Sequence, residues 1–285
     1  MRLQPTIKSH QNDAFKAVLR LQQASERRDR QLFLVEGTHL IEEAIATGWP
    51  LEAVWFEEEW AEGNGSLIDK ISSDTSRRSL VLQPATRELL RRLSTTSTRT
   101  PVIGIAAQLA STQPQTKPIA LGLVVESLQD PGNLGSMIRI AAAAGIGQVV
   151  LSRDSVSPTN PKVLRATAGQ WFRSPPLVTD LKEFLKEQSD ASVQILAACA
   201  DGISMWELDL KRPTLFLLGN EGHGLTTELR GLAACTVSVP MAEGVESLNV
   251  AITSALLIYE ALRQRGSERS PGTSEMQLRK NRETR

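Results

Sequence analysis

A short segment near the middle of the chain has the composition of a ligand-binding loop. Residues 129–139 read Gln-Asp-Pro-Gly-Asn-Leu-Gly-Ser-Met-Ile-Arg and lead into an alanine-rich helix pattern. Pro131, Gly132 and Gly135 permit a tight turn and a close backbone approach, and the start of a helix offers N–H groups to a phosphate. Arg139 would present a planar fork to a phosphate or a ribose hydroxyl. A plain turn followed by a solvent-facing arginine is the alternative.

A second segment places three glycines directly after an apolar strand pattern. Residues 215–224 read Leu-Phe-Leu-Leu-Gly-Asn-Glu-Gly-His-Gly. The glycine spacing is G-x-x-G-x-G and no Lys-Ser/Thr pair follows, so neither the P-loop nor the dinucleotide fingerprint G-x-G-x-x-G is met. Asn220 and Glu221 stand between the glycines. His223 is more simply interpreted as a solvated loop side chain than as a base.

A third segment, residues 237–251, brings polar side chains to the start of a long helix pattern. Ser247 could cap this helix, and Asn249 adds a donor and an acceptor at the same point. The apolar residues farther along the helix are expected in the core: Leu256, Leu257 and Leu262.

These three segments lie between the elements of an alternating strand and helix pattern. Strands are predicted at 120–125, 148–151, 193–197, 215–218 and 236–239, and helices at 134–144, 161–169, 180–188 and 248–263. Such alternation favours a parallel sheet with helices on both faces, in which loops at the carboxyl ends of the strands gather ligands. We therefore expect an α/β fold with ligand-binding loops at the carboxyl ends of its strands.

A polar stretch divides the chain. Residues 111–118 contain two prolines and no periodicity, which is typical of a linker. We expect a domain over 1–110, with strands at 32–35, 53–56, 80–82 and 102–105 and helices at 12–24, 38–47, 66–72 and 86–93, and a second domain over 119–265. Residues 266–285 are rich in Ser, Arg and Glu without apolar periodicity and are predicted to be disordered.

Composition excludes several classes of protein. The 285 residues carry 32 Lys and Arg against 32 Asp and Glu, so the chain is not a generically basic nucleic-acid coat. Two cysteines and three scattered histidines exclude a disulfide scaffold and make a metal site improbable. No long apolar run and no signal-peptide pattern is present, so we expect a cytoplasmic protein that does not bind membranes.

Taken together in this order, the three segments resemble the motifs of the SpoU (TrmH-type) branch of the SPOUT RNA methyltransferases. The first motif, Asn-x-Gly-x-x-x-Arg, is met by Asn133, Gly135 and Arg139. A strand ending in Gly-Asn-Glu-Gly is met at 219–222, and Pro-Met-x-x-x-Val-Glu-Ser-Leu-Asn-Val-Ala at 240–251. The resemblance covers about residues 120–262.

The resemblance implies an S-adenosylmethionine-dependent ribose 2′-O-methyltransferase with a deep trefoil knot and a mainly parallel sheet, acting as a homodimer. It implies that the knotted loops hold the cofactor through Gly219, Asn220, Gly222, Val239, Pro240, Met241 and Leu248. The N-terminal half is similar, less sharply, to a small RNA substrate-binding α/β domain akin to ribosomal protein L30e. Residues 33–37, Phe-Leu-Val-Glu-Gly, are its best marker.

The methyl donor of this family is already activated, so the protein must chiefly position the ribose hydroxyl. The catalytic residues that the resemblance implies are Arg139, Asn133, Glu221, Ser247 and Asn249. Because a guanidinium keeps its proton at neutral pH, we expect Arg139 to clamp the target phosphate or 2′-oxygen and not to act as a base. The displacement needs no metal.

RNA is the expected partner. Phosphate contacts are predicted for five arginines of the N-terminal half, with ordinary solvated helix faces as the alternative: Arg27, Arg28, Arg30, Arg91 and Arg92. A 2′-hydroxyl target excludes DNA, and ribosomal RNA is favoured over tRNA by analogy with family members that carry this extra domain. A tRNA methyltransferase and a non-catalytic RNA-binding protein that retains the knot are the alternatives. A dinucleotide-dependent oxidoreductase is disfavoured because the glycine fingerprint is missing.

Overall fold

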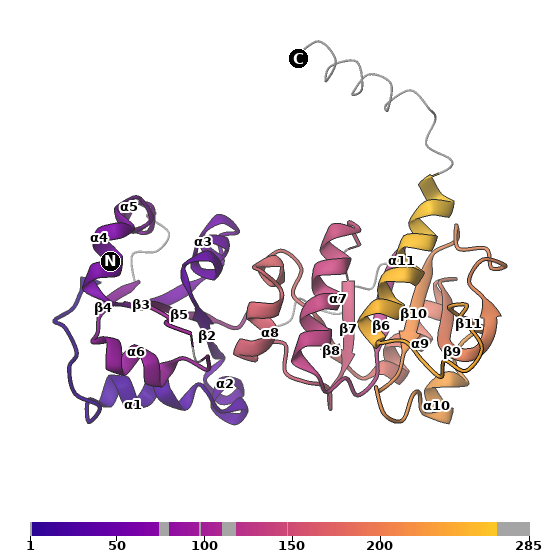
Figure 1. Ribbon diagram of the computed structural model, residues 1–285, viewed down its shortest axis with the longest axis horizontal. Coiled ribbons are helices and arrows are strands. Elements are labelled where there is room, and N and C mark those ends of the chain that lie inside the picture. Colours follow the sequence, from indigo (N-terminus) through magenta and orange to yellow (C-terminus); the bar gives the residue numbers. More distant parts are fainter. Residues whose placement is uncertain (1, 74–79, 97, 110–117, 147, 267–285) are drawn as a thin grey trace, which may run out of the picture.

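The computed structural model describes residues 2–73, 80–96, 98–109, 118–146 and 148–266, and these build two β-sheets (Figure 1). The first sheet uses residues up to Ala107 and the second uses residues 121–238. The predicted linker, except for Pro118, and the predicted tail, except for Gly266, lie outside the described residues. The domain boundaries at 110 and 119 therefore stay predictions.

The N-terminal sheet has five strands in the order β1-β4-β3-β5-β2. Their bounds are β1 Arg2–Leu3, β2 Leu32–Glu36, β3 Leu51–Phe56, β4 Val81–Pro84 and β5 Val102–Ala107. Strand β5 lies between β3 and β2 and runs antiparallel to both, whereas β1, β4 and β3 are mutually parallel. The sheet is therefore mixed.

Helices cover both faces of this sheet. Helices α1 (Asp13–Arg20), α2 (Ala24–Arg30) and α6 (Arg87–Leu93) lie below it in Figure 1, and α3 (Thr38–Ala46), α4 (Glu58–Gly63) and α5 (Gly65–Ser73) lie above it. The single helix predicted at 12–24 is in fact interrupted, because α1 ends at Arg20 and a new helix starts at Ala24. Side chains of β2 alternate between the faces: Phe33 and Val35 pack on one side and Leu34 on the other.

The second sheet has six strands in the order β11-β9-β10-β6-β7-β8, and every neighbouring pair is parallel. Their bounds are β6 Leu121–Val125, β7 Gln148–Ser152, β8 Leu177–Thr179, β9 Gln194–Ser204, β10 Thr214–Leu218 and β11 Cys235–Ser238. The predicted α/β class with a mainly parallel sheet is confirmed. Strand β8 has too few residues to show a period and was not predicted.

Two layers of helices cover the second sheet. Helices α7 (Pro131–Ala143) and α11 (Val250–Gly266) share one face with Leu123 and Val125, and α9 (Leu181–Asp190) and α10 (Thr227–Arg230) share the other with Val124. Leu257 is fully buried, but Leu256 is 39% exposed. The core assignment of Leu256 was therefore wrong, because it lies on the outer side of α11.

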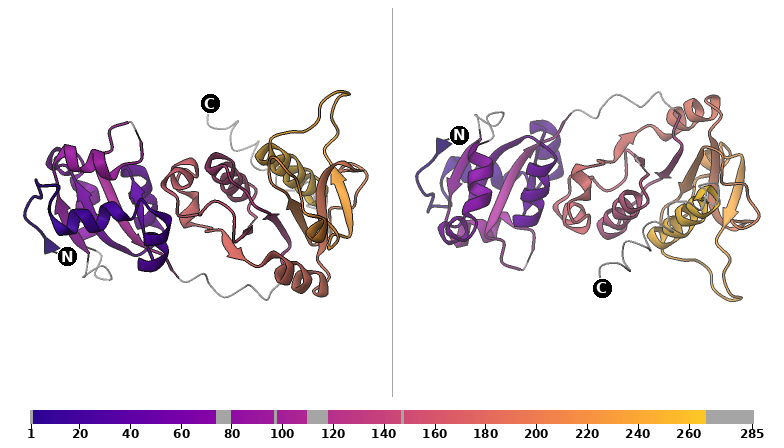
Figure 2. Two further views of the ribbon diagram at one scale, coloured as in Figure 1. Left: turned by 90° about the horizontal axis from the view of Figure 1, so that it is seen from below. Right: turned by 90° about the horizontal axis from the view of Figure 1, so that it is seen from above.

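A short segment joins the two sheets. Helix α8 (Pro161–Ala166) and the 3₁₀ turn at Gln170–Phe172 lie between them in all three views (Figures 1 and 2). Trp171 stacks edge-on against Phe33 and Trp49 of the N-terminal region, with ring centroids 5.1 and 4.9 Å apart. One apolar core therefore continues from one sheet to the other. The trefoil knot stays a prediction, because strand order alone does not decide it.

None of the helices within the described ranges is long and apolar enough to cross a membrane.

Candidate active site

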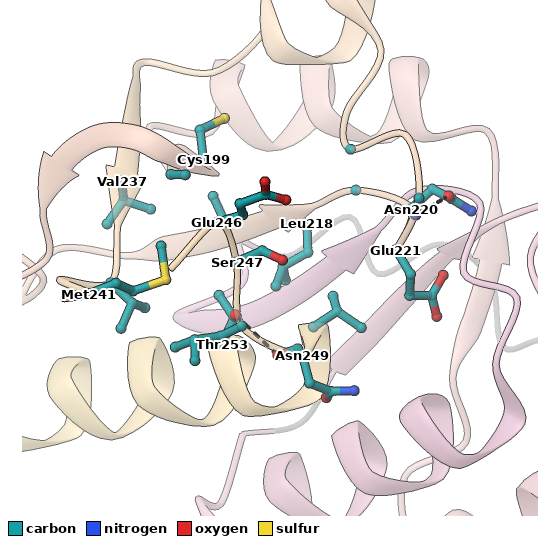
Figure 3. A pocket seen from close by; sticks show the side chains of 18 residues that line it. Cys199, Leu218, Asn220, Glu221, Val237, Met241, Glu246, Ser247, Asn249 and Thr253 are labelled. Carbon is teal, nitrogen blue, oxygen red and sulfur yellow. Dashed lines mark hydrogen bonds between the residues drawn. The ribbon is translucent and has the colours of Figure 1, made fainter. Parts of the chain in front are cut away.

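A cavity of about 580 Å³ opens beside the middle of β9, at the ends of β10 and β11 and at the start of α11 (Figure 3). It is lined by Ala198, Cys199, Ala200, Leu218, Gly219, Asn220, Glu221, Gly222, Gly224, Val237, Val239, Met241, Glu246, Ser247, Leu248, Asn249, Val250 and Thr253. The second and third motif segments, far apart in the sequence, thus form one wall. Pro240, a predicted cofactor residue, does not line it.

The glycine loop closes on itself at Gly219, where no side chain fits. A Cβ placed on Gly219 would lie 2.2 Å from the backbone carbon of Gly224. The loop is held by two backbone hydrogen bonds, from Asn220 N to Gly224 O at 3.0 Å and from Gly224 N to Asn220 O at 2.9 Å. Gly224 also has a φ of +68°, a conformation that favours glycine. The three glycines Gly219, Gly222 and Gly224 thus line the cavity with backbone.

The Asn220 side chain fixes this loop to the chain just before the first motif segment. Its Nδ2 donates to the carbonyl of Ser127 at 2.7 Å, and its Oδ1 accepts from the backbone of Gly222 and His223 at 2.8 and 3.2 Å. Asn220 thus has two roles: its side-chain amide joins two loops, and the residue also lines the cavity.

Asn133 connects all three motif segments. Its Nδ2 donates to Glu221 Oε1 at 3.1 Å, and its Oδ1 accepts from Asn249 Nδ2 at 2.9 Å. Asn133 comes from α7, Glu221 from the glycine loop and Asn249 from the start of α11. The structure brings together four of the five predicted catalytic residues, since Ser247 also lines the cavity beside Asn249.

The N-terminus of α7 is occupied by carboxylates. Asp130 caps the helix and accepts from Asn133 N at 2.7 Å, while Glu221 faces the backbone N–H groups of Gln129 and Asp130 at 3.5 and 3.4 Å. Two negative groups at this helix start would repel a phosphate. The phosphate site expected at this helix start is therefore not supported.

Gly135 has another role than the one predicted. It lies inside α7, where an added Cβ would come within 2.2 Å of the Ala166 side chain on α8. Its small size permits two helices to pack closely and does not shape a ligand turn.

Asn249, not Ser247, caps α11. Its Oδ1 accepts from Ala251 N at 2.9 Å and from Ile252 N at 3.3 Å. The predicted cap was wrong by two residues because the helix starts at Val250, later than the sequence pattern indicates. Ser247 is left exposed on the cavity rim.

Arg139 lies on α7 outside the cavity lining. Its side chain is exposed, and no hydrogen bond or ion pair joins it to another described residue. It lies six positions after Asn133, an axial rise of about 9 Å along a helix. This guanidinium is therefore accessible from solvent and is not part of the cavity wall.

The sequence did not predict the cavity-lining residues of β9 or the buried carboxylate that stabilises the glycine loop. Ala198, Cys199 and Ala200 come from β9, whose sequence has no polar signal for a site. Burial raises the pKa of the Cys199 thiol, with nearby Arg230 opposing the effect. The buried Glu126 carboxylate at the end of β6 accepts from the Thr226 backbone and hydroxyl at 2.9 and 2.8 Å, which anchors the end of the glycine loop.

The five arginines predicted to bind RNA differ in their surroundings. Arg27 is 4% exposed, and its Nη1 donates to the carbonyls of Leu21 and Gln22 at 3.0 and 2.8 Å. Its predicted RNA contact is corrected, because this guanidinium caps backbone inside the protein, where burial lowers its pKa.

The other four arginines are partly or fully exposed. Arg30 pairs with Glu26 and Arg92 with Glu88 on their own helices. Arg28 and Arg91 have no ion pair to another described residue. Arg28 and Arg91 therefore present the least compensated positive charge of the set.

Comparison with known proteins identifies the family of this chain. The sequence profile of the SpoU rRNA Methylase family matches residues 120–259, and that of the MRM3-like substrate binding domain matches residues 12–104. A sequence described as an uncharacterized tRNA/rRNA methyltransferase of Synechocystis is 36% identical over 272 residues, covering 94% of this chain and 97% of the relative. The chain belongs to the SpoU rRNA methylase family.

Further relatives of this SpoU methylase have named reactions or solved structures. The 23S rRNA (guanosine(2553)-2′-O)-methyltransferase RlmP of Bacillus subtilis is 30% identical and covers 89% of this chain and 97% of the relative. The AdoMet-bound rRNA methyltransferase from Sinorhizobium meliloti superposes with a TM-score of 0.81 at 27% identity, over 92% of this chain and 98% of that one. This SpoU methylase is thus an RNA methyltransferase whose cofactor is S-adenosylmethionine.

Proposed function

We propose that this protein methylates a ribose 2′-hydroxyl of ribosomal RNA, with S-adenosylmethionine as the methyl donor. The single observation that carries the proposal is the Asn133 bridge to Glu221 and Asn249, which joins the three family motifs beside one cavity. The relative named above as a 23S rRNA 2′-O-methyltransferase supports ribosomal RNA over tRNA.

The residues of the cavity fit the cofactor. Its volume of about 580 Å³ is in the range of small-molecule sites, which run from about 300 to 1,000 Å³. Apolar side chains suited to an adenine ring come from Leu218, Val239 and Leu248, and Glu221 and Glu246 place negative charge near a cationic ligand. The missing side chain of Gly219 lets the Gly224 backbone approach closely, which shapes this wall of the cavity.

The bound cofactor supplies a methyl group activated by its positive sulfur. The chain must then hold the ribose hydroxyl in line and stabilise the charge that develops as its proton leaves. Asn133 fixes Glu221 and Asn249 at the rim, which preorganises the cavity entrance. Arg139, exposed outside that rim, clamps a phosphate or the 2′-oxygen of the incoming nucleotide.

The N-terminal region binds the RNA substrate at a surface separate from the active-site cavity. Its residues 12–104 match a substrate-binding domain. Helices α2 and α6, which carry the exposed Arg28 and Arg91, lie on the same side of its sheet (Figure 1). Phosphate contacts there supply sequence-independent affinity.

The homodimer is supported by an uncovered apolar stripe on α11. Ile252, Leu256 and Tyr259 are 52%, 39% and 52% exposed and recur at spacings of four and three residues, which places them on one face of the helix. A contiguous apolar stripe of this kind is typical of a protein interface. A cytoplasmic location remains a prediction.

A direct experiment tests the function. Purified protein is incubated with isotope-labelled S-adenosylmethionine and either total rRNA or total tRNA, and ribose methylation is mapped by nucleotide. Label in rRNA at a 2′-O position is the expected result. Label in tRNA alone would replace the substrate, and cofactor binding without transfer to either RNA would favour the non-catalytic alternative.

A further inference from the structure

The segment between the two sheets contacts both functional regions at once. Ala166 of α8 packs against Gly135 of α7, the helix that carries Asn133 and Arg139. Its neighbour Arg165 reaches in the opposite direction and forms an ion pair with Glu36 at the end of β2, at 3.2 Å. Two adjacent residues thus link the motif-one helix to the substrate-binding region.

Glu36 is a buried carboxylate at the centre of this contact. Its side chain is 1% exposed. It accepts from Ser94 Oγ at 3.0 Å, from Thr95 N at 3.0 Å and from Thr95 Oγ1 at 2.8 Å. Arg165 Nη1 completes the set and also donates to Thr95 Oγ1 at 3.1 Å. A buried charge with four donors is costly to disturb.

The four donors to Glu36 come from two different regions of the chain. The three donors from Ser94 and Thr95 belong to the same region as Glu36, so they satisfy the carboxylate whether or not the two regions are docked. Arg165 is the donor that comes from the methyltransferase region. Loss of the Arg165 guanidinium therefore weakens the docking contact and leaves the local network of Glu36 in place.

The turn that follows α8 also contacts the N-terminal region, through α3. Ala168 and Gly169 have φ values of +48° and +84°, and the Ala168 carbonyl lies 3.3 Å from His39 Nε2. A Cβ on Gly169 would lie 2.4 Å from Glu43 Cγ. An alanine with a left-handed backbone conformation is strained and persists only where surrounding contacts stabilise it. The contacts with α3 supply that stabilisation.

We propose that Arg165, through Glu36, is a positioning residue that fixes the substrate-binding region relative to the methyl-transfer site. The inference rests on the proposed function. The contact between Arg165 and Glu36, here called the joint, sets the distance between the exposed Arg28 and Arg91, which bind RNA, and the cavity where the ribose is methylated. A rigid joint raises the effective concentration of the target ribose at the cavity, whereas a loose joint lowers it. Arg165 touches neither the cavity nor the reacting atoms.

The test compares three variants of the full chain. Arg165→Met removes the charge and keeps the aliphatic stem, Arg165→Lys restores a charge, and Lys182→Met is the matched control, because it breaks the ion pair with Glu228 inside the methyltransferase region. Each is measured for the KM and kcat of methyl transfer to the rRNA, for S-adenosylmethionine affinity, and for backbone hydrogen exchange of the RNA-free protein.

For Arg165→Met we expect the KM for RNA to rise about tenfold, with kcat at saturating RNA and cofactor affinity unchanged. Exchange should accelerate in residues 94–96 and in α8 but not in the strands of either sheet. Arg165→Lys should recover part of the KM, and Lys182→Met should resemble the wild type.

Two outcomes would overturn the proposal. A raised KM with unaltered exchange would make Arg165 a direct RNA contact, and wild-type KM with wild-type exchange would show that the joint does not depend on it. If the wild type itself transferred no methyl group to RNA, the proposed function would fail, while hydrogen exchange would still report whether Arg165 holds the joint.

Discussion

The side-chain amide of Asn249 donates a 2.9 Å hydrogen bond to Oδ1 of Asn133, a residue 116 positions earlier in the chain. Asn249 also caps α11 with its own Oδ1, so one amide both begins a helix and reaches the first motif. The start of α11 is therefore positioned by α7, and the shape of the cavity between them depends on this pair.

Replacing Asn133 with alanine removes both of its side-chain hydrogen bonds. Each such bond contributes about 1 kcal/mol, so we expect methyl transfer to fall at least tenfold, with a smaller loss of cofactor affinity. Steady-state kinetics and a cofactor titration measure the two effects. Asn64→Ala, which removes one hydrogen bond to Trp60 in the N-terminal region, is the control. Equal rates for the two variants would contradict the bridging role.

Gly219→Ala tests the closed glycine loop. The new Cβ would lie 2.2 Å from the Gly224 backbone, so the loop must open and its two backbone hydrogen bonds must lengthen. We expect the dissociation constant for S-adenosylmethionine to rise by more than about tenfold. Isothermal titration calorimetry measures it. Gly65→Ala places a Cβ in open space and should bind the cofactor as the wild type does.

Arg139 separates binding of the cofactor from transfer of the methyl group. Because its side chain is exposed and outside the cavity, Arg139→Ala should leave cofactor affinity unchanged and lower the transfer rate about a hundredfold or more. Arg139→Lys keeps the charge but not the planar fork and should recover little. Full activity of the lysine variant would exclude a bidentate clamp. Lys186→Ala, an exposed cation on α9, is the control for a general loss of charge.

The exposed and buried arginines of the N-terminal region should respond differently. Arg28→Gln and Arg91→Gln should weaken RNA binding and each lower the slope of log affinity against log salt by about 1. Arg27→Ala should instead lower the free energy of unfolding by about 2 kcal/mol, because it leaves buried carbonyls without a donor. Filter binding over a salt series and chemical denaturation distinguish the two classes. An unchanged salt slope in both glutamine variants would place the RNA surface elsewhere.

Cys199 provides a pH-dependent probe of the cavity. Burial raises the pKa of its thiol, so less thiolate is present at pH 8 than for an ordinary cysteine, and alkylation should be slow there and accelerate as the pH rises further. Because Cys199 lines the cavity, saturating S-adenosylmethionine should protect it. Mass spectrometry of maleimide-treated protein follows each cysteine, and Cys235, outside the cavity lining, serves as the internal control. Equal protection of both thiols would point to a global effect of the ligand.

Much of the fold could be predicted because its signals are local. The strand predicted at 215–218 and observed as β10, and the alternation of strands with helices, follow from side-chain periodicity and backbone preference over a few residues. The approximate positions of the three motif loops were found for the same reason. Helix starts were less accurate, as the cap at Asn249 shows, because Ser247 is an equally good cap by composition.

The sequence by itself determined the class of sheet, the loops at its carboxyl ends and the family to which they belong. Only the tertiary structure decided that Arg27 is buried, that Leu256 is exposed, that carboxylates occupy the start of α7, and that Glu36 meets Arg165 across 129 positions. These facts depend on which distant surfaces pack together. A residue type and its neighbours in the chain carry no record of that packing, since the same arginine is stable in solvent, in a backbone cap or in a buried ion pair.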